Sequence, residues 1–219
     1  MTATDVVRNA LRLGFATAAI VAMSYQLATS VALGRSGANF FSFFTIQSNI
    51  LAVAALFLLV LVRREERSPL VDGLRTGAVL YVAITGVVFA LLLSGLQQEL
   101  QTTTPWVDTV VHRVMPLVLV VDWLLDPPGH RLPAWAAAAW LVYPVAWFAY
   151  TLVRGEVVDW YPYPFVDVSE LGYGGVLARA AGLTVGFAVL ALGLLALGNR
   201  LARRRADPTP HAPVEQHAA

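Results

Sequence analysis

Asp108 and His112 are the residues best placed for chemistry, because they stand four positions apart in an otherwise apolar segment. This spacing puts two side chains on one face of a helix, so the Asp108 carboxylate can accept a hydrogen bond from one ring nitrogen of His112. The other ring nitrogen can then face a hydroxyl group from a neighbouring segment. A hydroxyl, a base and a group that orients the base are the parts that nucleophilic catalysis needs.

Hydroxyl and amide side chains are concentrated in residues 42–49. Helical spacing predicts that Ser42, Thr45 and Asn49 form one stripe along a helix. A second interpretation stays open at this point, because Ser and Thr are common where membrane helices pack, and a buried His often only bridges two helices. Spacing alone does not decide between a catalytic site and a packing interface.

The composition shows what must position these residues. Of 219 residues, 58% are hydrophobic and 13% are charged, whereas a soluble domain carries about a quarter charged residues. A helix needs about 20 apolar residues to cross a bilayer. The chain is therefore predicted to be all-α, a polytopic membrane helix bundle with one transmembrane domain over residues 1–199. The six expected spans are residues 9–32, 40–62, 74–97, 106–126, 133–153 and 175–198.

Arginine placement predicts the orientation of these spans, because cytoplasmic loops keep Lys and Arg near the ends of spans. The N-terminal segment, the 63–75 connection, the 127–132 connection and residues 200–205 all carry arginine, whereas the alternate connections carry little net positive charge. Both termini are therefore expected in the cytoplasm and the protein in the cell membrane. Residues 200–219 are expected to form a basic, disordered cytoplasmic tail.

The helical rise per residue then predicts how deep each polar residue lies in the membrane. At a rise of about 1.5 Å per residue, Thr45 lies about 8 Å and His112 about 9 Å below the outer boundary of the membrane. Arg179 lies near the outer end of the last span, at a similar level. Asp122 lies about 15 Å farther along its helix than His112, so it is expected in a structural ion pair or a proton path.

The connection between the last two spans is unusually aromatic, with the sequence WYPYPFVDV at residues 160–168. Its X-Pro steps favour extended backbone. Tyr163, Pro164 and Phe165 are expected either to anchor the chain at the membrane interface or to form a lid or wall of an acyl-chain pocket that also includes Arg179.

Three passages together resemble the androgen-induced membrane protein family, six-span proteins whose animal members are threonine hydrolases of fatty acid esters of hydroxy fatty acids. The passages are Phe44-Thr45-Ile46 within FFSFFTIQSN, His112 followed by Pro116 and Asp122, and Tyr163-Pro164-Phe165 followed by Asp167. The resemblance implies a six-span fold, with Thr45 as the nucleophile and His112 as the general base.

The leading hypothesis is an intramembrane hydrolase of a lipid ester that acts on a membrane lipid or a lipid-like small molecule. Asp108 would hold the His112 tautomer, and Asn49 or Gln47 would stabilise the oxyanion. The alternative is a non-catalytic lipid-binding protein, or a small transporter with a polar path through Asp108, His112 and Arg179. The chain has no cysteine, which excludes disulfides and thiolate ligands. We expect no metal or other cofactor, and the scattered arginines indicate no nucleic-acid partner.

Overall fold

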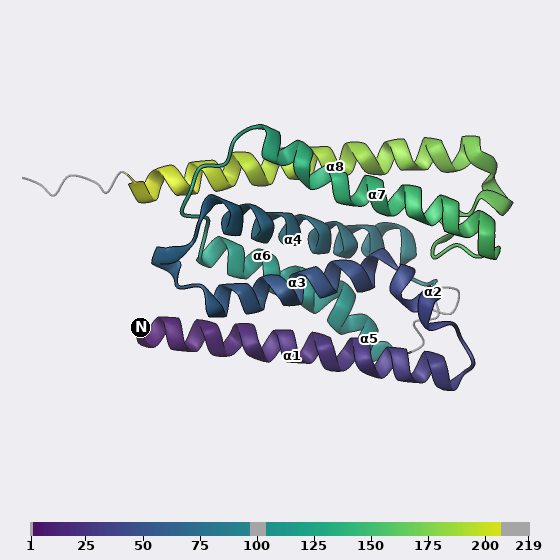
Figure 1. Cartoon of the computed structure of the whole chain (residues 1–219), viewed down its shortest axis with the longest axis horizontal. Helices are drawn as coiled ribbons and strands as arrows, with labels where there is room; N and C mark the ends of the chain where they lie inside the picture. Colours follow the sequence, from purple (N-terminus) through teal and green to yellow (C-terminus); the bar gives the residue numbers. More distant parts are fainter. Residues whose placement is uncertain (1, 97–103, 207–219) are drawn as a thin grey trace, which may run out of the picture.

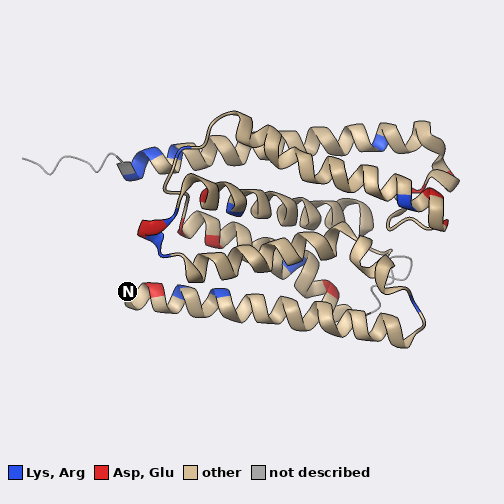
Figure 2. Ribbon diagram, viewed as in Figure 1, with Lys and Arg blue, Asp and Glu red and all other residues tan. Residues whose placement is uncertain are grey.

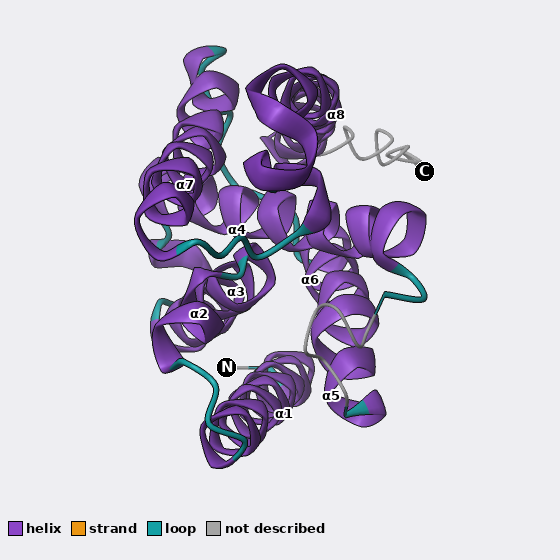
Figure 3. Ribbon diagram, turned by 90° about the vertical axis from the view of Figure 1, so that its right-hand side faces the viewer, coloured by secondary structure: helices purple, strands orange, loops and turns teal. Residues whose placement is uncertain are grey.

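The computed structural model describes residues 2–96 and 104–206, and every regular element in these ranges is a helix (Figures 1 and 3). The long helices lie side by side along the long axis of the molecule, and short connections join them at its two ends. In chain order the elements are α1 (Ala3–Ala32), α2 (Gly37–Ser42), α3 (Phe44–Leu61), η1 (Arg64–Glu66), α4 (Pro69–Val88), η2 (Phe89–Leu93), α5 (Pro105–Thr109), η3 (Val110–Val114), α6 (Met115–Leu125), α7 (Trp135–Val158), η4 (Pro164–Val166) and α8 (Val168–Ala206).

Five helices among the described residues are long and apolar enough to cross a membrane. They are α1, α3, α4 together with η2, α7 and α8. This result confirms the prediction of an all-helical chain with several apolar helices suited to a membrane. The predicted span 106–126 is also helical over residues 105–125, but the π-helical turn η3 divides it into α5, η3 and α6.

Two predicted segments differ from the helices that form. Segment 40–62 is two helices, because Phe43 has extended dihedrals (φ −66°, ψ 129°) between α2 and α3. The last helix, α8, is longer than the predicted 175–198, and Gly172 interrupts it near its start (φ 63°, ψ 163°). Residues 200–205 are therefore helical and not part of a tail, and residues 207–219 of the expected tail lie outside the described residues.

The helices pack around two apolar cores. In the first core α3 packs against α1 and α4, and α4 packs against α6. In the second core α7 and α8 pack together and join α4 and the η4 segment. The outer side of α8 carries exposed apolar side chains such as Val185 and Val189, and a lipid environment would cover them.

Charged residues gather at the end of the bundle that holds the N-terminus, and others lie at the opposite end (Figure 2). Asp122 accepts hydrogen bonds at 2.7 Å from both Arg12 and Arg75, so it takes part in structural ion pairs, one of the two expected roles. Asp126 is fully buried, and guanidinium groups of five arginines lie 2.8–3.9 Å from its carboxylate oxygens. We call this group the arginine cluster, and it consists of Arg8, Arg12, Arg64, Arg67, Arg75, Arg205, Asp122 and Asp126.

Candidate functional site

Thr45 is the second residue of α3, directly after the break at Phe43. The first backbone N–H groups of a helix have no partner within the helix, and Phe43 provides no side-chain cap. The N–H group of Thr45 instead donates to the hydroxyl oxygen of Tyr163 at 3.2 Å. The break thus places the Thr45 hydroxyl at a helix N-terminus, beside donors that are not used in the helix.

Thr45, His112 and Asp108 form one hydrogen-bonded row. His112 Nε2 lies 3.1 Å from Thr45 Oγ1, and His112 Nδ1 lies 3.0 Å from a carboxylate oxygen of Asp108. All three side chains are buried. Because a carboxylate accepts, Nδ1 carries the proton in this arrangement, and Nε2 is left to accept the Thr45 hydroxyl proton. The predicted contact between Asp108 and His112 is confirmed.

His112 lies on the π-helical turn η3, four residues before Pro116. Proline has no N–H, so it cannot donate to the carbonyl of His112 as an α-helix would require. The ring of His112 stacks on Phe89 with centroids 4.1 Å apart and planes at 15°. Arg113 is exposed, and its guanidinium carbon lies 5.7 Å from the centre of the same Phe89 ring.

Helix α4 approaches this turn most closely at Gly86. A Cβ atom at position 86 would lie 3.0 Å from Cβ of Pro116 and 3.3 Å from the carbonyl oxygen of His112. These distances are shorter than an ordinary van der Waals contact. Glycine at position 86 therefore lets α4 pack directly against the backbone that carries His112.

We expect Gly86→Ala to lower the free energy of unfolding by about 1–3 kcal/mol, because the added methyl group overpacks this contact. Gly73→Ala is the matched control, since Gly73 lies on the same helix and a methyl group there would have no neighbouring atom within 4 Å. Alanine there should leave stability unchanged or raise it slightly. Thermal unfolding in detergent measures both changes, and equal midpoints for Gly86→Ala and wild type would contradict the packing argument.

Tyr163 is part of the site itself. Its side chain is buried, and its hydroxyl oxygen lies 3.2 Å from Thr45 Oγ1 in addition to accepting the Thr45 N–H. Its ring stacks on Phe165 at 5.1 Å and meets Phe43 edge to face at 5.5 Å. Tyr163 therefore does not anchor the chain at a surface, and Tyr163 and Phe165 form a wall of the cavity at Thr45, whereas Pro164 does not line it. The sequence predicted the wall but not the hydroxyl contact.

Ser42 and Gln47 face away from the Thr45 hydroxyl. Ser42 belongs to α2, and its hydroxyl donates to the carbonyl of Ala38 and contacts the Tyr150 hydroxyl at 2.9 Å. Gln47 donates to the carbonyl of Phe41 and accepts from Tyr143. The predicted stripe is wrong for Ser42 because the backbone break at Phe43 interrupts the helical repeat.

Asn49 lies one turn below Thr45 but does not supply a free donor. Its amide nitrogen donates to the carbonyl of Thr45 at 2.9 Å and to the carbonyl of Val111 at 3.1 Å, so both amide hydrogens are used. Asn49 thereby ties α3 to the π-helical turn that carries His112. The expected oxyanion role of Asn49 is replaced by this positioning role.

Arg179 lies on α8 with an exposed side chain and does not line the cavity beside Thr45. A depth along a helix does not give the direction of a side chain around the helix axis. The expected pocket role of Arg179 is therefore wrong.

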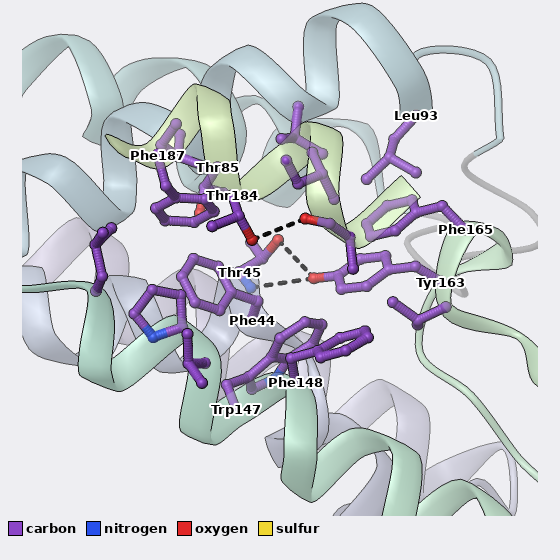
Figure 4. A pocket seen from close by; sticks show the side chains of 18 residues that line it. Phe44, Thr45, Thr85, Leu93, Trp147, Phe148, Tyr163, Phe165, Thr184 and Phe187 are labelled. Carbon is purple, nitrogen blue, oxygen red and sulfur yellow. Dashed lines mark hydrogen bonds between the residues drawn. The ribbon is translucent and has the colours of Figure 1, made fainter. Parts of the chain in front are cut away.

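A large apolar cavity opens beside Thr45 (Figure 4). Its volume is about 110 Å³. Thr45 and Tyr163 form one part of its wall, and other side chains of α3, α4, η2, η4, α7 and α8 form the rest. Several of these lining residues carry no signal in the sequence that marks them, because they are apolar side chains like their neighbours. Among them are Trp147, Phe148 and Phe187.

The described residues contain no group of three His, Asp or Glu side chains that could hold a metal ion. The functional groups at Thr45 are one imidazole, one carboxylate, two hydroxyls and a helix N-terminus. These groups can activate the Thr45 hydroxyl and donate hydrogen bonds to a developing oxyanion.

Comparisons of this chain with protein-family models, with curated proteins and with solved structures find no match.

Proposed function

We propose that this chain is a hydrolase of the cell membrane that cleaves a lipid ester, with Thr45 as the nucleophile and His112 as the base. The observation that carries the proposal is the hydrogen-bonded row of Thr45, His112 and Asp108 beside a large apolar cavity. A packing interface alone would not require this order of hydroxyl, imidazole and carboxylate. The resemblance to the androgen-induced membrane proteins assigns the first two roles to the same residues.

The proposal includes six membrane spans with both termini in the cytoplasm. Residues 105–125 form a helical run of the length that a sixth span needs. The arginine cluster lies at the end of the bundle that holds the N-terminus (Figure 2), which favours that end as the cytoplasmic one. Thr45 and His112 would then lie toward the outer leaflet, where a lipid can enter from the side.

In the first half of the reaction His112 Nε2 takes the proton of Thr45 Oγ1, and the oxygen attacks the ester carbonyl carbon. The Tyr163 hydroxyl lies 3.2 Å from the attacking oxygen and is placed to donate to the oxyanion, and the Thr45 N–H in turn donates to the Tyr163 hydroxyl oxygen. The bond to the alcohol oxygen then breaks, and His112 gives this oxygen the proton. An acyl ester of Thr45 remains. Water hydrolyses it, with His112 taking a proton from the water and returning one to Thr45.

The transport alternative has less support. A transporter needs polar groups along its full depth, but buried Met115, Leu119 and Leu56 lie in the apolar core between the His112 turn and the arginine cluster. Asp122 and Asp126 at that end are engaged by arginine.

A fluorophosphonate probe tests the proposal, because an activated hydroxyl displaces fluoride and keeps the phosphonyl group. We expect labelling of the purified wild-type protein, with the phosphonyl group located on Thr45 by mass spectrometry. Thr45→Ala and His112→Ala should lose at least about 100-fold in labelling rate, the lower range for removing an acid–base group. Thr109→Ala is the control, since its exposed hydroxyl donates only to its own helix.

Two results would contradict the proposal. Labelling that persists in Thr45→Ala would exclude Thr45 as the nucleophile. If wild type is not labelled and cleaves no lipid ester, yet a fluorescent fatty acid binds with saturation, the lipid-binding alternative replaces the hydrolase.

A further inference from the structure

A second, smaller cavity meets Thr45 from the opposite side. Its volume is about 30 Å³, compared with about 110 Å³ for the large cavity. Thr45 and Tyr163 line both cavities, so they form the partition between them. The other walls of the small cavity come from α1, α2, α3 and the α5–η3 segment, together with Ser36 and Phe43.

The two cavities differ in chemistry. The large cavity is almost wholly apolar, and its two remaining hydroxyls, Thr85 and Thr184, donate to carbonyl groups of their own helices. The small cavity includes the polar side chains of Gln26, Ser30 and Ser36. A hydrocarbon chain therefore suits the first cavity, and a group with hydroxyls suits the second.

His112 lines the small cavity and not the large one. This position matters because the acid that protonates a leaving oxygen must lie within hydrogen-bond reach of it. The departing alcohol must therefore be on the His112 side of Thr45, in the small cavity. The acyl group, bound to the carbonyl carbon on the other side, must extend into the large cavity.

We infer that the substrate is a monoester of a long-chain fatty acid with a small polyhydroxy alcohol, bound with the chain in the large cavity and the alcohol in the small one. The inference rests on the proposed function and adds the substrate class and its direction of binding. Thr45 Oγ1 forms a bond to the carbonyl carbon, the bond from that carbon to the alcohol oxygen breaks, and the Thr45 proton passes through His112 to the alcohol.

The polar end of the small cavity lies near the connection between α1 and α2, where an alcohol group could contact water. Ser30 lies near the end of α1, and Ser36 caps the start of α2. Both are thus close to the connection that we place at the outer surface. A polyhydroxy alcohol could lie toward water there, while its acyl chain lies among α4, α7 and α8 within the bilayer. Water for hydrolysis of the acyl-Thr45 ester can enter by the same route after the alcohol leaves.

Two pairs of esters and two variants test this arrangement with purified protein in detergent. One pair is 1-hexadecanoyl and 1-octanoyl glycerol, which differ in the acyl chain. The other pair is 1-hexadecanoyl glycerol and ethyl hexadecanoate, which differ in the alcohol. Leu183→Trp narrows the large cavity on α8, and Ser30→Leu fills the small cavity and removes a hydroxyl. Release of fatty acid gives kcat/KM for each ester.

We expect wild type to prefer the hexadecanoyl chain and the glycerol ester. Leu183→Trp should lower the hexadecanoyl-to-octanoyl ratio of kcat/KM about 10-fold and leave the alcohol ratio unchanged, because a lost pocket contact changes specificity by about 10–200-fold. Ser30→Leu should lower the glycerol-to-ethyl ratio about 10-fold and leave the chain ratio unchanged. Ser30→Ala is the milder second variant, which should lower the same ratio by a few fold.

Fluorophosphonate labelling of Thr45 is measured in every variant to show that the site is intact. If Ser30 variants change the chain ratio, or Leu183→Trp changes the alcohol ratio, the direction of binding is reversed and the inference is wrong. Wild type that hydrolyses esters but prefers ethyl hexadecanoate would exclude the polyhydroxy alcohol. Absence of both hydrolysis and labelling would instead reject the proposed function.

Discussion

Asp108→Asn is expected to lower kcat for ester hydrolysis by about 10³–10⁴-fold and to leave the fold unchanged. The asparagine amide can turn its N–H₂ group toward His112 Nδ1, which must then accept, and the ring proton moves to Nε2. In that tautomer Nε2 cannot take the proton of Thr45 Oγ1, although every heavy atom keeps its place. A change of about 10⁴-fold is the known size of this effect in a serine protease triad.

The measurement is kcat and fluorophosphonate labelling rate, compared with the thermal midpoint of unfolding. Asp159→Asn is the control, because Asp159 is exposed at the end of α7 and has a positive φ of 50° that asparagine adopts readily. Unchanged kcat in Asp108→Asn would reduce the contact between Asp108 and His112 to a structural bridge. Asp108→Glu is a second variant for the case in which Asp108→Asn loses both kcat and folding. Because glutamate restores a carboxylate, it should recover part of the rate.

The contact between Asp108 and His112 could be predicted from the sequence because it lies within one helical turn. The contact of His112 with Thr45 could not be predicted from helical spacing, because the two residues are 67 positions apart. Depth along the spans placed both residues at one level, and the family resemblance paired them. Depth gives no direction around a helix axis, and Arg179 shows this, because its side chain is exposed and does not line the cavity beside Thr45.

The residues that were misplaced depend on backbone features without a clear sequence signal. Phe43 is one more aromatic residue in a run of them, yet its extended dihedrals end α2 and turn Ser42 away from Thr45. The π-helical turn at His112 brings the Val111 carbonyl within reach of Asn49. Tyr163 contacts Thr45 although the two residues are 118 positions apart. Only the folded connection shows that the Tyr163 hydroxyl makes this contact.

The arginine cluster stabilises one end of the bundle through ion pairs. Asp126 lies at the centre of the cluster. One Asp126 oxygen accepts from Arg12 and Arg67 at 2.8 Å each, and the other lies 3.0 Å from Arg64. These arginines come from α1 and from the connection around η1, so a single carboxylate holds together segments far apart in the chain. Arg12, Arg67 and Asp126 are all buried.

Asp126→Asn is therefore expected to lower the free energy of unfolding by about 3–5 kcal/mol, the effect of removing one partner from a buried ion pair. Asparagine has nearly the same shape but no charge, so buried Arg67 would lose its carboxylate partner, and Asp122 would be the one carboxylate left in the arginine cluster. Glu65→Gln is the matched control, since its pair with Arg63 is exposed and 4.0 Å long, and such pairs contribute about 0–1 kcal/mol. Tryptophan fluorescence during thermal unfolding in detergent measures both variants. Equal midpoints for Asp126→Asn and wild type would mean that the arginines do not depend on this carboxylate, and the cluster would then not be what holds this end of the bundle together.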